Sequence, residues 1–187
     1  MLDARVHHFG VTSGPFALLY TNVALPRVST YTYALASLGG GYAWQLLGEH
    51  QLALRASGTL GWHIPFRQES TLGGASDVRG YAFHQLRGDT VAVARAEYSV
   101  PLFRWRPLAF RALAFFDSGY IALRHGAGNT LRDYLPVERG AWWRNATGAG
   151  LRIYVRSVVL PLVGFDVGYG IESHTPELYF ELGLTDF

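Results

Sequence analysis

Alternation of apolar and polar residues, interrupted by Gly, Pro, Asn or Ser, recurs along nearly the whole chain and constrains its fold most. Successive side chains of a β-strand point to opposite faces, so this period of two predicts strands, and the 3.6-residue period of a helix is almost absent. We therefore expect an all-β, antiparallel protein of about eight strands. The expected strands cover residues 14–25, 30–46, 50–62, 89–100, 108–120, 146–157, 159–171 and 177–187.

The expected strands carry their charges on one face and their aliphatic and aromatic residues on the other. In 108–120, for example, Arg111 and Asp117 lie opposite Phe110 and Phe116. A soluble β-sandwich alternates in the same way, with its polar face in water. Aromatic residues near strand ends, and a polar face that mixes Arg with Asp, Glu and Gly, favour a transmembrane β-barrel with a polar lumen. Most expected strands also reach the roughly 9 to 11 residues that a tilted strand needs to cross a bilayer.

Short and long connections alternate along the chain, as they do between the periplasmic and outer faces of such barrels. The long connections are 63–88 and 121–145, and residues 1–13 form a tail before the first strand. In 30–46 the apolar phase changes across residues 39–41, which are all Gly. A β-bulge or bend is therefore expected there.

The composition of the chain excludes several classes of function. The 187 residues suffice for one domain, expected to span 1–187, and the absence of Cys excludes disulfides and thiolate metal sites. The net charge is only +2 and every basic residue is Arg, which does not fit a nucleic-acid-binding protein. No apolar run is long enough for a transmembrane helix. The first residues also lack the pattern of a secretory signal, so we expect any signal to lie upstream or to have been removed.

Candidate catalytic and metal-binding residues are few. The nucleophile motif G-x-S-x-G is absent, because Gly74, Ala75 and Ser76 are followed by Asp77 and Val78. His7 and His8 are adjacent, so on a strand they face opposite sides and cannot share one metal ion. The remaining histidines have no ligand-like spacing. We expect no enzyme activity, no metal and no cofactor.

The segment 72–81 reads L-G-G-A-S-D-V-R-G-Y and is unlike a strand or a helix. Its glycines permit positive φ angles and tight turns, so we expect a compact loop that presents Arg79. An arginine in such a place needs an acidic partner.

Four blocks carry a resemblance to a known family: L-G-G-x-x-x-V-R-G-Y at 72–81, A-E-Y-S-V-P-L at 96–102, F-F-D-S-G at 115–119 and G-A-G-L-R at 148–152. With the closing L-Y-F-E-L-G-L-T-D-F, they resemble the C-terminal half of the barrel in the BamA/TamA superfamily of outer-membrane assembly factors and related secretion transporters. The resemblance implies a non-catalytic barrel of the bacterial outer membrane that inserts or translocates proteins through a lateral seam. The implied partners are outer-membrane lipids or lipopolysaccharide, nascent outer-membrane proteins or a secreted substrate, and a second copy of the chain.

The resemblance also implies roles for particular residues. The loop would enter the lumen, where Arg79 would meet Asp117, a residue that the alternation independently places on the polar face. The implied loop anchor comprises Arg79, Gly80, Tyr81, Asp117 and Gly119. The polar faces supply a lumen charge network, expected to comprise Arg95, Glu97, Arg111, Arg152, Arg156 and Asp166. The implied C-terminal assembly signal comprises Phe180, Leu182, Gly183 and Phe187.

Two alternatives stay open. The chain supplies about half of the strands of a 16-stranded barrel of this family, so it is either the closing half of such a barrel or a small barrel closed on eight strands. In function, the alternative to protein assembly is a stand-alone or oligomerising pore-forming barrel that anchors a separate upstream domain.

Overall fold

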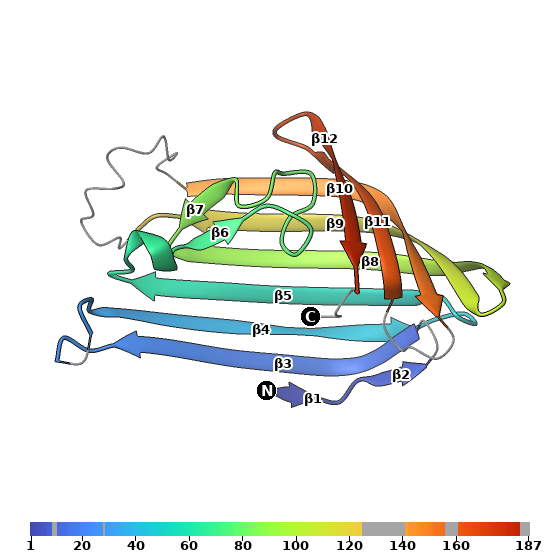
Figure 1. Ribbon diagram of the computed structural model, residues 1–187, viewed down its shortest axis with the longest axis horizontal. Coiled ribbons are helices and arrows are strands. Elements are labelled where there is room, and N and C mark those ends of the chain that lie inside the picture. Colours follow the sequence, from blue (N-terminus) through green and yellow to red (C-terminus); the bar gives the residue numbers. More distant parts are fainter. Residues whose placement is uncertain (9–10, 28, 125–140, 156–160, 184–187) are drawn as a thin grey trace.

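A computed structural model describes residues 1–8, 11–27, 29–124, 141–155 and 161–183 of the chain (Figure 1). The described residues form one ten-stranded antiparallel sheet and a separate two-stranded hairpin. The sheet order is β1-β3-β4-β5-β8-β9-β10-β11-β12, with β2 beside β3. The elements are β1 (Leu2–Asp3), β2 (Val6–His8), β3 (Val11–Ala24), β4 (Tyr33–Gln45), β5 (Gln51–Trp62), η1 (Phe66–Gln68), β6 (Ser70–Leu72), β7 (Leu86–Gly88), β8 (Thr90–Trp105), β9 (Leu108–Ala122), β10 (Ala141–Val155), β11 (Pro161–Gly170) and β12 (Thr175–Leu182).

The all-β, antiparallel fold predicted from the alternation is confirmed, and each of the eight expected strands corresponds to one of the long strands. The sheet curls, so that β12 crosses in front of strands from the middle of the sheet (Figure 1). It is not closed: among the described residues β12 pairs only with β11, and β3 pairs with β1, β2 and β4. No helix among the described residues is long and apolar enough to cross a membrane.

The two faces of the curled sheet differ as the alternation requires. The concave face carries charged residues that are nearly inaccessible, including Arg111, Asp117 and Asp166. The convex face exposes large apolar side chains, which is the arrangement of a membrane barrel. Among the most exposed are Leu60, Trp62, Phe116, Trp143, Phe165, Leu178, Phe180 and Leu182.

The phase break expected at residues 39–41 is wrong. The register of β4 with β3 and with β5 runs without a shift, so Tyr33 and Leu35 simply lie on the concave face. Glycine is needed at 41 for another reason: a Cβ there would lie 2.8 Å from the Phe16 ring. The register shifts that do occur lie between Pro101 and Phe103 and between Ile153 and Tyr154.

Several element bounds differ from those expected. The tail expected at 1–13 contains β1 and β2, which pair with β3. The strand expected at 146–157 begins at Ala141, and residues 125–140 of the long connection lie outside the described residues.

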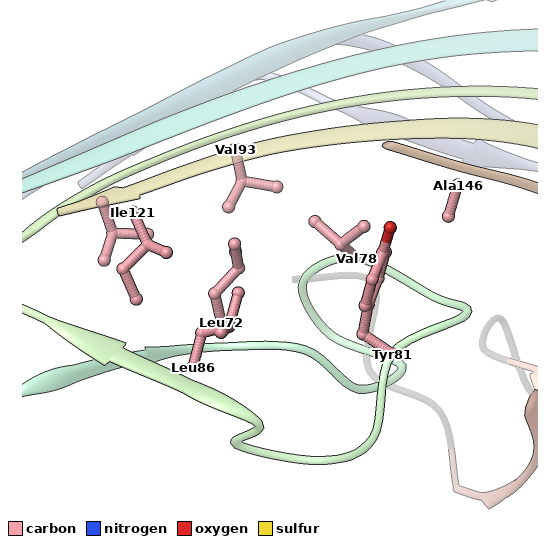
Figure 2. Close-up of a cluster of buried hydrophobic side chains, with 8 residues drawn as sticks. Leu72, Val78, Tyr81, Leu86, Val93, Ile121 and Ala146 are labelled. Carbon is pink, nitrogen blue, oxygen red and sulfur yellow. The ribbon is translucent and has the colours of Figure 1, made fainter. Parts of the chain in front are cut away.

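The connection 63–88 lies on the concave face and contains the hairpin of β6 and β7 (Figures 1 and 2). Figure 2 shows Val78 and Tyr81 pointing from this connection towards the sheet. They join a buried cluster formed by Leu72, Val78, Tyr81, Leu86, Val91, Val93, Ile121 and Ala146. This apolar contact holds the connection on the sheet and brings residue 79 to the charged groups of the concave face.

Candidate functional site: the loop around Arg79

The loop that follows β6 depends on glycine for its shape. Gly73, Gly74 and Gly80 have φ angles of 115°, 107° and 98°, a region that other residues seldom adopt. A Cβ at Gly73 would lie 2.4 Å from the carbonyl oxygen of Ala82. These glycines let the chain reverse within a few residues and direct the side chain of Arg79 towards β9.

Arg79 forms a two-pronged ion pair with Asp117 of β9. Its Nε lies 2.7 Å from Asp117 Oδ2 and its Nη2 lies 2.8 Å from Asp117 Oδ1. The backbone N–H of Arg79 also donates to Oδ2, at 3.1 Å. Both residues are completely buried. The charge-assisted bonds therefore fix the side chain and the loop backbone together.

Two further carboxylates meet the same guanidinium. Nη1 of Arg79 lies 2.6 Å from Glu97 Oε1 on β8 and 3.2 Å from Asp166 Oδ2 on β11. The guanidinium carbon lies 3.5 Å from the centre of the Phe115 ring, a cation–π contact. Burial alone would lower the pKa of Arg79, but the hydrogen bond to Asp117 and the three negative charges raise the pKa above its ordinary value. Arg79 is thus a permanent cation shared by three strands.

The expected charge network is largely present around this centre. Arg95 lies 3.5 Å from both Glu97 Oε1 and Asp117 Oδ1 and donates to the carbonyl oxygen of Ser76 at 2.8 Å. Arg152 donates to Asp166 at 2.8 Å. The structure therefore brings Arg79, Arg95, Glu97, Asp117, Arg152 and Asp166 into one cluster, which we call the Arg79 cluster.

Two expected members of the network lie apart from this cluster. Arg111 donates to Ser99 Oγ at 3.0 Å and to the carbonyl oxygen of Glu49 at 2.7 Å, and within the described chain no ion pair with a carboxylate is found for it. Arg156 lies outside the described residues.

The glycines of the two family blocks make room for the loop. A Cβ on Gly80 would lie 2.6 Å from the backbone nitrogen of Gly170 on β11, so the loop and strand backbones are in direct contact. A Cβ on Gly119 would lie 2.6 Å from Val78 Cγ2. Both positions require the absence of a side chain.

Tyrosines bind the loop to the last hairpin, a set of contacts that the sequence analysis did not predict. The N–H of Gly80 donates to the hydroxyl of Tyr179 on β12 at 2.9 Å, and that hydroxyl donates to the carbonyl oxygen of Tyr81 at 2.8 Å. The Tyr81 hydroxyl in turn donates to Glu172, in the turn between β11 and β12. Glu172 also accepts hydrogen bonds from the backbone N–H and the side chain of Asn145, at 2.8 and 2.6 Å.

The pKa values of Tyr81 and Glu172 are both shifted in the direction that favours the hydrogen bond between them. Burial and the hydrogen bond to Glu172 raise the pKa of Tyr81 to about 12, so its hydroxyl remains a donor. Burial opposes ionisation of Glu172, but hydrogen bonds from Asn145 and Tyr81 hold its pKa below the usual value. Alternation could place Tyr179 on the concave face, but Glu172 lies in a turn, where no periodicity applies.

The residues implied as an assembly signal are mostly on the convex face. Phe180 and Leu182 point outward and are 58% and 69% exposed, and the Phe180 ring lies 4.9 Å from that of Phe165. Gly183 follows β12 with a φ of 63°. Phe187 lies outside the described residues.

The chemistry that the site offers is electrostatic anchoring. The charges of the Arg79 cluster are engaged with one another, and the guanidinium of Arg79 is closed off from solvent. In the described ranges no three His, Asp or Glu side chains come together as metal ligands.

Comparison with known proteins adds the family. The sequence model of the Omp85 superfamily domain matches residues 8–185. A search of curated proteins finds no match.

Proposed function

The chain belongs to the Omp85 superfamily, and from this premise we propose that it is an outer-membrane barrel protein that inserts or translocates other proteins without catalysis. Members of the superfamily are outer-membrane proteins of assembly and translocation, and are generally non-enzymatic. The observation that carries the proposal is the match over residues 8–185 together with a curled sheet whose two end strands, as far as their residues are described, are not paired with each other.

The proposed working part is a seam at β12. An edge strand presents free backbone N–H and C=O groups, and in a membrane these groups must find partners. A strand of a client protein can supply such partners by β-augmentation. The side chains of Phe180 and Leu182 are exposed on the convex face of the same strand, where lipid would cover them.

The loop around Arg79 is proposed to control this seam. The Arg79 cluster joins the loop to β8, β9 and β11, and Tyr179 joins it to β12. A client can then displace β12 only by breaking the two hydrogen bonds that the Tyr179 hydroxyl makes with the loop. These two hydrogen bonds, which we call the Tyr179 tie, therefore set how easily β12 separates from the loop.

Reconstitution in lipid vesicles tests the proposal. Vesicles that contain the chain should speed up the insertion of a urea-denatured outer-membrane barrel protein, measured by its resistance to added protease. Tyr179→Phe removes only the tie, so it should change the insertion rate while the protein still folds. Tyr169→Phe is the matched control, because among the described residues its hydroxyl has one hydrogen-bond partner, the nearby His174 at 3.3 Å, and none in the loop. Equal insertion in empty and protein-containing vesicles would refute the proposal.

A pore-forming barrel that anchors another domain is the second candidate, and one observation favours it. A mainly polar cavity of about 460 Å³ lies on the concave face, between the loop and the strand ends at the short turns. Ion conductance across a planar bilayer without any acceleration of client insertion would favour this second function over the first.

A further inference from the structure

The cavity of about 460 Å³ on the concave face has an unusual lining. Four arginines line it but only two acidic residues do, and the cavity extends from the loop around Arg79 towards the short turns. The charged residues of the lining are Arg55, Arg95, Arg111, Arg152, Glu97 and Glu181.

The sheet register places these arginines opposite one another. Arg55 of β5 is the direct cross-strand partner of Arg95 on β8, and Arg111 of β9 is the direct partner of Arg152 on β10. Like charges at directly opposed positions of two strands repel each other. Two such pairs around one cavity require negative charge nearby.

The acids of the Arg79 cluster supply that charge at one end only. Glu97 and Asp166 are engaged by Arg79 and Arg152. Arg111 is only 3% exposed, and its hydrogen bonds go to the Ser99 hydroxyl and to the carbonyl oxygens of Ser99 and Glu49, none of which carries a charge. The Glu49 carboxylate lies near Arg111 but is paired with Arg104. Across the described residues no carboxylate pairs with Arg111. A buried cation that is not directly paired with a carboxylate is costly.

A second donor is also unused. Nε of Arg95 is buried and forms no hydrogen bond within the described structure, although Asp117 Oδ1 lies 3.5 Å away. Near the loop, Arg95 is thus held by an ion pair without a hydrogen bond at Nε, and near the short turns Arg111 has no paired carboxylate.

We propose that this cavity is a binding site for a phosphate-bearing anion, with Arg111 as its principal ligand. A guanidinium offers two parallel N–H donors that match two oxygens of a phosphate group, and the Ser99 hydroxyl beside it adds a neutral donor. Arg152 and Arg55 add positive charge around the same space. Glu181 of β12 also lines the cavity, but the proposed anion site does not depend on the proposed role in protein insertion.

The test is calorimetric titration of the full chain with inorganic phosphate in an uncharged maltoside detergent, with ionic strength held constant by chloride. Saturable binding is expected. Arg111→Gln should weaken it by about tenfold or more, since a hydrogen-bonded charge is lost. Arg106→Gln is the matched control, because it makes the same charge change in the turn between β8 and β9 on an exposed side chain that does not line the cavity. Absence of saturable binding, or equal weakening in both variants, would overturn the proposal.

A second variant keeps the test decisive if Arg111→Gln does not fold. Ser99→Asp places a carboxylate beside Arg111 and so supplies the missing counter-charge from within the chain. It should abolish phosphate binding and raise the thermal stability measured in phosphate-free buffer. Retained phosphate binding in a folded Ser99→Asp protein would contradict the assignment.

Changing the lipid distinguishes the two possible sources of the phosphate, a lipid headgroup and a soluble compound. The same titration is carried out in nanodiscs of phosphatidylcholine with and without phosphatidylglycerol. If the natural ligand is a lipid headgroup, phosphatidylglycerol should compete and weaken the apparent affinity for inorganic phosphate. If it is a soluble phosphate compound, the affinity should be the same in both.

Discussion

At the scale of single residues, Arg79 is the most demanding group in the molecule. It is completely buried and contacts three carboxylates that come from three strands. Removing one partner of such a buried ion pair leaves the other groups without compensation, and this costs far more than losing an exposed pair. The pair with Asp117 should therefore matter most, because Asp117 accepts three of the hydrogen bonds from Arg79.

We expect Asp117→Asn to lower the free energy of unfolding by about 3 kcal/mol, at the low end for a buried ion pair because Asn still accepts a hydrogen bond. Urea unfolding in detergent, followed by tryptophan fluorescence, measures the change. Asp3→Asn is the control, since the Asp3 to Arg5 ion pair lies in the short N-terminal strand region and should contribute under about 1 kcal/mol. A loss for Asp117→Asn no larger than for Asp3→Asn would contradict the anchoring role.

The reciprocal exchange of Arg79→Glu with Asp117→Arg should not restore stability. The carboxylate introduced at position 79 would face Glu97 and Asp166, which lie 2.6 and 3.2 Å from Nη1 of Arg79. Like charges at such distances repel strongly in a buried site. A double variant as stable as the original chain, by the same urea measurement, would show that these two acids do not share the arginine.

Glu172 gives the loop a dependence on pH. Its pKa is lowered by the hydrogen bonds from Asn145 and Tyr81, so the stabilisation is present above the ordinary value of 4.5 and is lost as the pH falls through the lowered pKa. The protection factors of residues 79–82 in hydrogen exchange, which correct for the slower intrinsic exchange at low pH, should therefore fall on acidification. Glu172→Gln should remove this dependence, and an unchanged acid response in that variant would assign it to another group.

At the scale of secondary-structure elements, the contact between the loop and β11 is a contact between backbones. Gly80→Ala adds a methyl group 2.6 Å from the Gly170 nitrogen at a φ of 98°, so we expect a loss of about 2 kcal/mol or more and faster proteolysis of the loop. Gly48→Ala separates the steric contact from the backbone penalty of a positive φ. Its φ is 64° but nothing lies within 4 Å, so only the backbone penalty of about 1 kcal/mol should appear. Equal losses in both variants would argue against close docking on β11.

The strands were predictable because one physical rule governs most of them. A side chain on a long strand has only two directions, so the position of Arg111 or Asp166 on the polar phase was enough to place it on the concave face. The rule misled for β4, where Tyr33 and Leu35 are apolar and yet face inward. An apolar residue is tolerated on the inside of a barrel as well as on the outside, so apolar phase alone does not identify the face.

The alternation of residues could not predict contacts that involve turns or that depend on the register of neighbouring strands. The bond between Tyr81 and Glu172 joins a loop and a turn that are 91 residues apart, and no periodicity relates them. The opposition of Arg111 and Arg152 follows from the register of β9 with β10, which the alternation of residues does not determine. Asp166 was placed in the lumen network by its phase, but only the fold showed that it shares Arg79 with Glu97 and Asp117.

At the scale of the whole molecule, the two ends of the sheet approach each other, and no pairing between them is found in the part of the chain that the structure describes. Thr12 of β3 and Glu181 of β12 line the same cavity. We expect Thr12→Cys and Glu181→Cys, in a chain that has no other cysteine, to be joined within one molecule by a flexible bifunctional maleimide. Electrophoretic mobility after denaturation measures the product. Thr12→Cys with Leu60→Cys is the control, because Leu60 lies on the convex face at the other end of β5. Cross-links only between molecules would contradict this arrangement.

The contacts of the loop around Arg79 also bear on the order in which the strands of the sheet can assemble. The arginine precedes its ligands along the chain, Asp117 by 38 residues, Asp166 by 87 and, through Gly80, Tyr179 by 99. During synthesis and insertion the loop can form early, but its charge is balanced only when β9 and β11 have been laid down, and its backbone is tied only when β12 arrives. A barrel that lacks its last hairpin would carry an unseated loop, recognisable to proteases. The loop is therefore expected to be fully anchored only in molecules whose last hairpin has formed.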